Sequence, residues 1–341
     1  MTTALSRWTA ANGRPRGGAT DTDDRPPGGT TAAGPAPVPA ARPTSVPAAR
    51  PAPDRPAAIG PGRPAAKPLA GAAGSGGAGD RVPLRAGRPR VEGDWLLVPA
   101  PQAHRPYRLF CFPHAGGDAT AYTPLARALA PTAEVWALRP PARGGRGRHP
   151  MPADFDRLVA AVVEAIGPHL TGAADGRFGF YGQSFGALLA YEVARALPAH
   201  RRPDLVVAVG APAPGEWSGR RTKDLDAAEL LRLTGLDELV LADPDLTERA
   251  LAAIRVDLAV SGTYRHRPHA PIGSDLLALA GAADPMLATC GLTGWAGHTR
   301  GAFGHRVVPG GHLLATVDRP GPVELLTSLI RSRVASEEFS C

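Results

Sequence analysis

The sequence predicts an α/β fold in which helices cover both faces of a mostly parallel central sheet. Three observations lead to this prediction. Short apolar segments typical of buried strands alternate with helical segments from residue 109 onward. A serine flanked by glycines stands between one of these strands and the helix that follows it. Residues 216–268 then interrupt the alternation with helical sequence and no clear strand, which we expect to form a helical lid.

Each element is predicted from its local sequence. The strands are short apolar or aromatic runs at 109–112, 134–139, 177–181, 205–209, 276–281 and 305–309. The helices have longer amphipathic or helix-favouring patterns, at 120–130, 155–166, 185–197, 226–233 and 246–260. The helix that begins at Phe185 ends before Pro198, because proline lacks the N–H that a continuing helix needs. The last two helices belong to the lid.

The first 93 residues differ in composition from the rest. Pro, Ala, Gly, Arg and Thr dominate them, so they can bury too little apolar surface to offset the entropy of ordering. We predict a disordered tail over residues 1–93 and one domain over residues 94–336. A start codon assigned too far upstream would explain the tail, and so would a basic arm that docks an acidic partner.

Net charge also separates the two parts of the chain. Residues 1–90 hold 13 Lys and Arg against 5 Asp and Glu, while the whole chain has a net charge of +7, so the remainder is close to neutral. We therefore expect no nucleic-acid binding by the domain. The sequence has neither an apolar run long enough to cross a membrane nor a signal peptide, which predicts a cytoplasmic protein with no membrane partner.

Cysteine and histidine spacing predicts no metal site. None of the three cysteines shows disulfide or metal-ligand spacing: Cys111, Cys290 and Cys341. Cys111 lies in an apolar strand, which predicts a buried free thiol. His266 and His269 are close in sequence, but Pro268 prevents a regular helical face there, and no acidic or cysteine residue is nearby in the sequence.

The pentapeptide Gly182-Gln183-Ser184-Phe185-Gly186 is the clearest functional motif. A Gly-x-Ser-x-Gly between a strand and a helix is typical of the nucleophile elbow of α/β-hydrolase folds, a strained turn that lifts the serine hydroxyl to the top of the sheet. The glycines leave room for the turn, and the N-terminus of the helix lies next to the hydroxyl. The motif predicts an α/β-hydrolase fold with Ser184 as its nucleophile.

A serine nucleophile needs a base, and in this fold the partners follow in the order Ser, then Asp or Glu, then His. His312 ends the sequence Gly310-Gly311-His312, a loop that leaves the last predicted strand, where the base belongs. His305 begins that strand, at the wrong edge of the sheet. His298 is expected in an exposed loop. The predicted base is therefore His312.

Asp284 is the predicted acid. It follows the carboxyl end of the apolar strand 276–281, and catalytic groups gather at the carboxyl ends of the strands in open α/β sheets. Asp275 stands at the entry end of the same strand, and Asp318 comes after the histidine and fits the chain order poorly. The alternative role for Asp284 is that of a turn former before Pro285.

Two main-chain N–H groups are expected to bind the oxyanion. One belongs to Phe185, directly after the nucleophile, and the other to the loop 113–117 after an early strand, with Ala115 as the candidate donor. Small residues in this loop let its backbone approach a reacting carbonyl closely. His114 precedes the serine in the chain, so we expect it to position the loop rather than act as the base.

Taken together, these motifs resemble a known family. The chain is similar to the type II, stand-alone thioesterases that accompany polyketide synthases and non-ribosomal peptide synthetases, from about Trp95 to Val334. The stretches that match are Arg108–Gly117, the elbow with Ala187–Glu192, Gly281–Pro285, Gly294-Trp295 and Pro309–His312. The resemblance implies a triad of Ser184, Asp284 and His312 and an acyl or peptidyl carrier protein as partner. Phosphopantetheine would enter as part of the substrate, with no cofactor. We expect a monomer.

Two positions depart from the family's pattern. The residue before the nucleophile is usually His and is Gln183 here, which can still hydrogen-bond. The usual P-G-R-G-x-R loop after the second strand reads P-A-R-G-G-R over residues 141–146. We expect these differences to alter the surroundings of the elbow and the entrance to the site, not the mechanism.

The expected reaction is hydrolysis of an acyl thioester, with removal of stalled or mis-primed acyl groups as its role. Only the resemblance indicates a thioester, because the same residues would also cleave an oxygen ester. The alternatives are a small-molecule carboxylesterase or lipase and a non-catalytic scaffold that recruits a synthase. The complete set of Ser, Asp and His argues against the scaffold.

Overall fold

An eight-stranded sheet forms the centre of the protein, seen in a computed structural model that describes residues 87–102, 107–170, 177–217, 242–285, 291–314 and 320–335. The strands lie in the order β1-β2-β4-β3-β5-β6-β7-β8. Their bounds are β1 Arg90–Glu92, β2 Leu96–Val98, β3 Arg108–Phe112, β4 Glu134–Leu138, β5 Phe178–Gln183, β6 Leu205–Val209, β7 Asp275–Gly281 and β8 Phe303–Val308. All neighbours from β4 to β8 pair in parallel, which confirms the predicted sheet.

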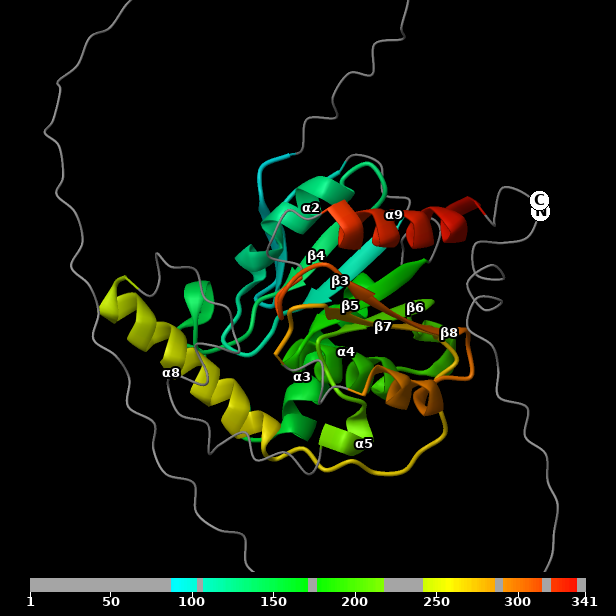
Figure 1. Cartoon of the computed structure of the whole chain (residues 1–341). Coiled ribbons are helices and arrows are strands. Elements are labelled where there is room, and N and C mark those ends of the chain that lie inside the picture. Colours follow the sequence, from blue (N-terminus) through cyan, green and yellow to red (C-terminus); the bar gives the residue numbers. More distant parts are fainter. Residues whose placement is uncertain are drawn as a thin grey trace, which may run out of the picture. The chain divides into compact units, whose positions relative to one another are not determined.

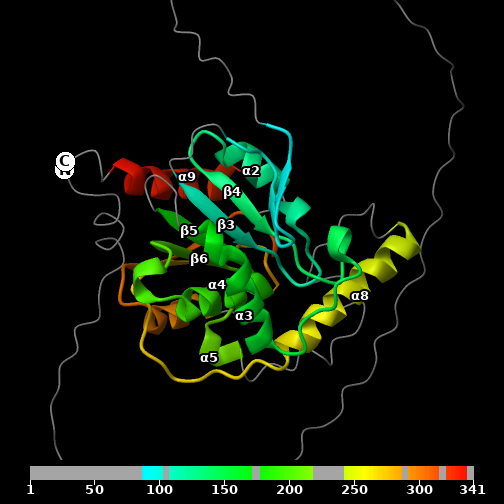
Figure 2. The same ribbon diagram turned by 180° about the vertical axis from the view of Figure 1, so that it is seen from behind.

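Helices cover both faces of this sheet (Figures 1 and 2). One face carries α2 and α9, and the other carries α3 and α4; their bounds are α2 Thr123–Leu129, α9 Pro320–Ala335, α3 Phe155–Ile166 and α4 Phe185–Ala196. Alternate residues of β3 pack against the helices on the two faces, because successive side chains of a strand point to opposite faces. Leu109 and Cys111 join the apolar cluster around α2 and α9, and Phe110 and Phe112 join that around α3 and α4.

Shorter helical segments connect these elements. They are the 3-10 helices η1 Ala119–Tyr122, η2 Gly144–Arg146, η3 Gly167–His169, η4 Ala199–Arg201 and η7 Leu292–His298, and the α-helix α5 Pro214–Trp217. Cys111 is a buried free thiol, as predicted. Cys290 and Cys341 lie outside the described residues.

The N-terminal edge of the sheet differs from the prediction. β1 begins at Arg90, before the expected start of the domain at residue 94. Gly93, with φ of 55°, turns the chain between β1 and β2, so that the two strands pair antiparallel. The boundary at residue 94 is therefore too late by at least one strand. The rest of the predicted tail, through residue 86, lies outside the described residues, and so does the C-terminal boundary at residue 336.

Helix α8, at Pro244–Ser261, is the described helix of the predicted lid. Asp243 caps it by accepting hydrogen bonds from the main-chain N–H groups of Asp245 and Leu246. Its buried residues fall in the C-terminal half, from Leu251 onward, so this half packs on the domain (yellow in Figure 1). Residues 218–241, with the predicted helix 226–233, lie outside the described part. Among the residues that the structure describes, no helix is long and apolar enough to cross a membrane.

Candidate active site

Ser184 stands at the turn between β5 and α4 with the backbone of a nucleophile elbow. Its φ is 54° and its ψ −119°, a region that residues with a Cβ rarely adopt, so the turn stores strain. Its main-chain N–H donates to the carbonyl of Val209 in the neighbouring strand, at 2.7 Å. The flanking glycines are sterically required, since a Cβ at Gly182 would overlap Gly186 and one at Gly186 would overlap Phe112.

Asp284 and His312 lie in direct contact, although they come from different loops. Nδ1 of His312 is 2.9 Å from Oδ2 and 3.0 Å from Oδ1 of Asp284. The loops after β7 and β8 approach closely, because Gly281 has no Cβ to hold Gly311 away and Ala283 N–H donates to Gly310. The Asp284 side chain is fully buried and that of His312 is 9% exposed. A carboxylate can only accept, so this contact puts the imidazole proton on Nδ1 and leaves Nε2 as the acceptor.

Gln183, the residue before the serine, is bonded to the loop that carries His312. Its Nε2 donates to the carbonyl of His312 at 2.6 Å, and its Oε1 accepts from the main-chain N–H of Leu314 at 3.1 Å. The side chain is buried, and Gly210 leaves room for it: a Cβ there would come within 3.1 Å of Gln183 and of His312. These contacts of Gln183 could not be predicted from the sequence, because His312 and Leu314 are not close to it along the chain.

The proposed oxyanion residues lie at the carboxyl ends of adjacent strands. Ala115 follows β3 and Phe185 follows β5, and these strands pair in parallel up to Phe112 and Gly182. Both residues are buried. Phe185 begins α4, where main-chain N–H groups of the first turn have no partner within the helix. The chain leaving β3 packs against the start of α4, since a Cβ at Gly186 would overlap the main chain of Phe112 and Pro113.

His114 is held in the same loop as Ala115. Its carbonyl accepts a hydrogen bond from Gly117 N–H at 2.9 Å, and a Cβ at Gly117 would collide with its ring. Burial, and then the neighbouring His312 and Arg143, lower the pKa of His114 to about 4. The His114 ring is thus neutral at pH 7. It packs against Gly117 within the loop.

A buried ion pair that was not predicted from the sequence links the loop at 113–117 to α8. Arg143 donates two hydrogen bonds to Asp257 of α8, one of them 2.6 Å from Nη1 to Oδ2. The same Oδ2 accepts from Gly116 N–H at 2.8 Å, and Nη1 also donates to the carbonyl of Gly117 at 3.1 Å. The side chains of Arg143 and Asp257 are 7% and 2% exposed. Burial raises the pKa of Asp257, and the bonds from Arg143 act against this shift.

A signal for this pair is present in the sequence. Leu251, Ile254, Asp257 and Val260 share the buried side of α8 at a spacing of three residues. A carboxylate on an apolar stripe needs a buried partner. The Arg-containing loop at 141–146, noted for its departure from the family, provides that partner.

The other candidate acids and bases lie elsewhere. Asp275, at the entry end of β7, accepts from Arg333 at 2.7 Å and from Ala302 N–H at 2.8 Å, which is a structural role. His305 lies within β8, paired with Ala278. Asp318 lies outside the part of the chain that the structure describes.

His298 is not the exposed loop residue that the sequence predicts. It ends η7 and is half-buried, because its ring packs edge-on against Tyr191 and Trp295 at centroid distances of 5.4 and 6.0 Å. Burial, followed by the nearby His266 and His269, lowers its pKa to about 4.

Comparison with known proteins gives a consistent result. A sequence profile described as the thioesterase domain matches residues 107–331. Thioesterase PikA5 of Streptomyces venezuelae is 35% identical over 226 residues, which are 64% of this chain and 79% of that protein. The solved structure of the RedJ thioesterase, from the prodiginine pathway of Streptomyces coelicolor, shares 31% identity at a TM-score of 0.59, over 67% of this chain and 87% of that one. The solved structure of the type II thioesterase BorB, from the borrelidin biosynthetic cluster, shares 30% identity at a TM-score of 0.62. The match covers 71% of this chain and 100% of that one.

Proposed function

The chain belongs to the thioesterase domain family, and from this premise we propose that it is a serine thioesterase whose catalytic triad is Ser184, His312 and Asp284. The observation that supports this most directly is the contact of His312 Nδ1 with the fully buried Asp284, beside a serine held in a strained turn. Asp284 would fix the tautomer of His312 and stabilise its protonated form.

In the proposed reaction, Ser184 Oγ attacks the thioester carbonyl while His312 Nε2 takes the hydroxyl proton. The negative charge develops on the carbonyl oxygen, where the N–H groups of Phe185 and Ala115 would stabilise it. The C–S bond then breaks, and the thiolate or the solvent takes the proton from His312, which leaves the imidazole neutral again. A thiol with a pKa of about 8.5 is a good leaving group, so its departure needs little protonation. Water attacks the acyl-serine with His312 again as the base, which releases the acid and restores Ser184.

The proposed substrates are acyl or peptidyl groups on the phosphopantetheine arm of a carrier protein, and the role is the release of stalled or mis-primed groups. The relatives support this substrate class: BorB is a type II thioesterase from a biosynthetic cluster, and RedJ comes from a biosynthetic pathway. Phosphopantetheine then arrives with the substrate, and the triad needs no cofactor. We propose that the chain acts as a monomer on its carrier.

A direct comparison of substrates tests this proposal. The full chain is given one acyl group in three forms: bound to a holo carrier protein, as the pantetheine thioester and as the p-nitrophenyl ester, with Ser184→Ala as the blank. The proposal predicts the highest kcat/KM on the carrier-bound thioester. A higher value on the oxygen ester would favour a carboxylesterase. Failure of a fluorophosphonate to label Ser184 would favour a non-catalytic scaffold.

A further inference from the structure

Three histidines gather beside α4, in a cluster that contains none of the proposed catalytic residues. His266 and His269 belong to the segment between α8 and β7, and His298 ends η7. Their ring centroids are 5.9 Å apart for 266 and 269, 5.7 Å for 266 and 298, and 6.5 Å for 269 and 298. Glu192 of α4 reaches the same place, about 12 Å of helix rise beyond Ser184.

Donor atoms of this cluster lie close enough to share one ion. Glu192, His266 and His269 each offer a ligand atom, and these atoms all lie within 4.8 Å of one another. Ligands about 2.1 Å from a tetrahedral zinc ion are about 3.4 Å apart, so the side chains would have to close by about 1.4 Å at most. The two histidines are half-buried, which leaves their side chains room for that adjustment.

His269 is already in the form that binds a metal. Its Nδ1 is 3.0 Å from the carbonyl of Ala270, and since a carbonyl only accepts, the ring proton must be on Nδ1. Nε2 therefore keeps its lone pair. This atom is buried and has no hydrogen-bond partner among the described residues. A ring that donates from one nitrogen to a main-chain carbonyl and offers the other is the usual arrangement of a metal ligand.

Glu192 is fixed by its own neighbours. Its Oε1 accepts from the Tyr264 hydroxyl at 2.7 Å, and its Oε2 from Arg195 at 2.5 Å. The Tyr264 hydroxyl is also 3.3 Å from Nδ1 of His266. The buried carboxylate thus supplies negative charge next to the imidazoles, while Arg195 offsets part of it. We expect micromolar affinity, weaker than that of a closed structural zinc site.

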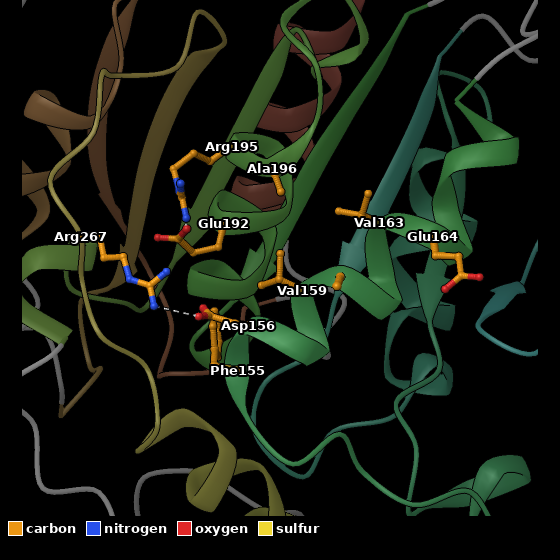
Figure 3. A pocket seen from close by; sticks show the side chains of 10 residues that line it. Phe155, Asp156, Val159, Val163, Glu164, Glu192, Arg195, Ala196 and Arg267 are labelled. Carbon is orange, nitrogen blue, oxygen red and sulfur yellow. Dashed lines mark hydrogen bonds and ion pairs between the residues drawn. The ribbon is translucent and has the colours of Figure 1, made fainter.

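Glu192, one of the three residues that offer a ligand atom, also borders a cavity. A cavity of about 540 Å³ lies between α3 and α4, and Glu192, Arg195 and Arg267 are on its lining (Figure 3). Arg267, which lies between the two loop histidines in sequence, forms an ion pair with Asp156 of α3 at 3.2 Å. This ion pair connects the segment that carries His266 and His269 to α3 at the edge of the cavity.

We propose that Glu192, His266 and His269 bind a zinc ion that joins the segment after α8 to α4, with the ring of His298 packed beside them. Imidazole nitrogens and a carboxylate oxygen are donors that zinc prefers. His266 and His269 were not predicted to bind a metal, because Pro268 lies between them and no acidic or cysteine residue is close to them in the chain. The fold brings Glu192 to them from 74 residues away. This proposal is independent of the thioesterase mechanism, because the ion would be structural.

The test uses the untagged full chain, dialysed against EDTA. Zinc affinity is measured by competition with a chromophoric chelator, and stoichiometry by elemental analysis. Cobalt substitution is followed through its visible absorption, which reports tetrahedral coordination. We expect one zinc per chain, a raised Tm on zinc addition, and at least about tenfold weaker binding by His269→Asn.

Two variants serve as controls. His305→Asn removes a histidine of β8 outside the cluster, and His312→Ala removes an imidazole of the active site; both should bind zinc like the wild type. Activity of His269→Asn on a small thioester, measured without zinc, shows that this variant is folded. The proposal is overturned if the wild type shows no saturable binding at micromolar zinc, or if His269→Asn binds as tightly as His305→Asn. Loss of binding in His312→Ala alone would also overturn it, by placing the ion in the active site.

Discussion

Gln183 holds the main chain of His312 through a 2.6 Å hydrogen bond from its Nε2 to the His312 carbonyl, across a separation of 129 residues. The residue before the nucleophile is thus tied to the proposed base. The amide is suited to this place, because it donates to His312 and accepts from Leu314 at the same time. An imidazole can do the same only while it is neutral.

Gln183→Ala should lower kcat about 10- to 100-fold with little change in KM, since a displaced His312 affects the chemical step more than binding. It also leaves two buried main-chain groups unpaired, which should reduce the free energy of unfolding by about 1–3 kcal/mol. Gln183→His, which introduces the residue expected here from the family resemblance, should keep kcat near pH 8 but lose it as the new imidazole is protonated. Unchanged kcat in Gln183→Ala would show that the bond does not position His312.

The proposed triad predicts a non-additive set of losses. Ser184→Ala should abolish turnover, and Asp284→Asn should reduce kcat on the order of 10⁴-fold, because the neutral amide no longer fixes the tautomer of His312. The double variant should be scarcely worse than Ser184→Ala, since the residues act as a unit. Steady-state kinetics on a pantetheine thioester measure all three. If Asp284→Asn keeps more than a few per cent of wild-type kcat, the acid is another residue, with Asp318 next to be tested.

The pair of Arg143 and Asp257 predicts that the attachment of α8 affects both stability and turnover. Asp257→Asn leaves a buried guanidinium without its counter-charge and puts a donating amide in place of one of the two oxygens that accept from Arg143. We therefore expect a loss of about 3–5 kcal/mol in the free energy of unfolding. We also expect a lower kcat, because Asp257 and Arg143 together hold the backbone of Gly116 and Gly117. Glu248→Gln is the matched control. It breaks an exposed ion pair with Arg255 on the same helix, at 3.3 Å, and should change stability by less than about 1 kcal/mol. Equal effects in urea denaturation would contradict this role of the buried pair.

The low pKa of His114 predicts a loss of stability in acid. In the unfolded chain the pKa returns to about 6.5, so between pH 6.5 and about 4 the unfolded state binds more protons and the native state loses stability as the pH falls. The loss is at most about 1.4 kcal/mol for each pH unit. His114→Asn should remove this contribution. Urea denaturation at pH 7 and pH 5 measures it, and an equal drop in wild type and variant would refute it.

The sequence predicted correctly those helices and strands whose ends are determined by neighbouring residues in the chain. The bounds of α3 and β6 coincide with the predicted ones, because an amphipathic stripe capped by Asp154 and a short β-branched run each define their own ends. The antiparallel strands β1 and β2 and the helix α9 were missed. β1 has only three residues and exists through its pairing with β2. α9 begins with Pro320 and has no side-chain pattern as regular as that of α3.

The candidate site could be predicted only in part, because some of its contacts join residues that are far apart in the sequence. Ser184, Asp284 and His312 follow strand ends, so chain order and topology were enough to select them as the candidate triad. The contacts of Gln183, Asp257 and His298 depend on loops that meet in space. Polar residues on apolar stripes, such as Asp257, are the one local sign that a distant partner exists.

The most direct test of the proposed function is to trap the acyl-enzyme. The chain is mixed with an acyl carrier protein that bears a slowly hydrolysed acyl group, quenched in acid within the first turnover, digested and analysed by mass spectrometry. The account predicts the mass of the acyl group on the peptide that contains Ser184, formed as a burst with release of the holo carrier and absent in Ser184→Ala. Turnover of the carrier thioester without acylation of Ser184, or an acyl group on another residue, would contradict it.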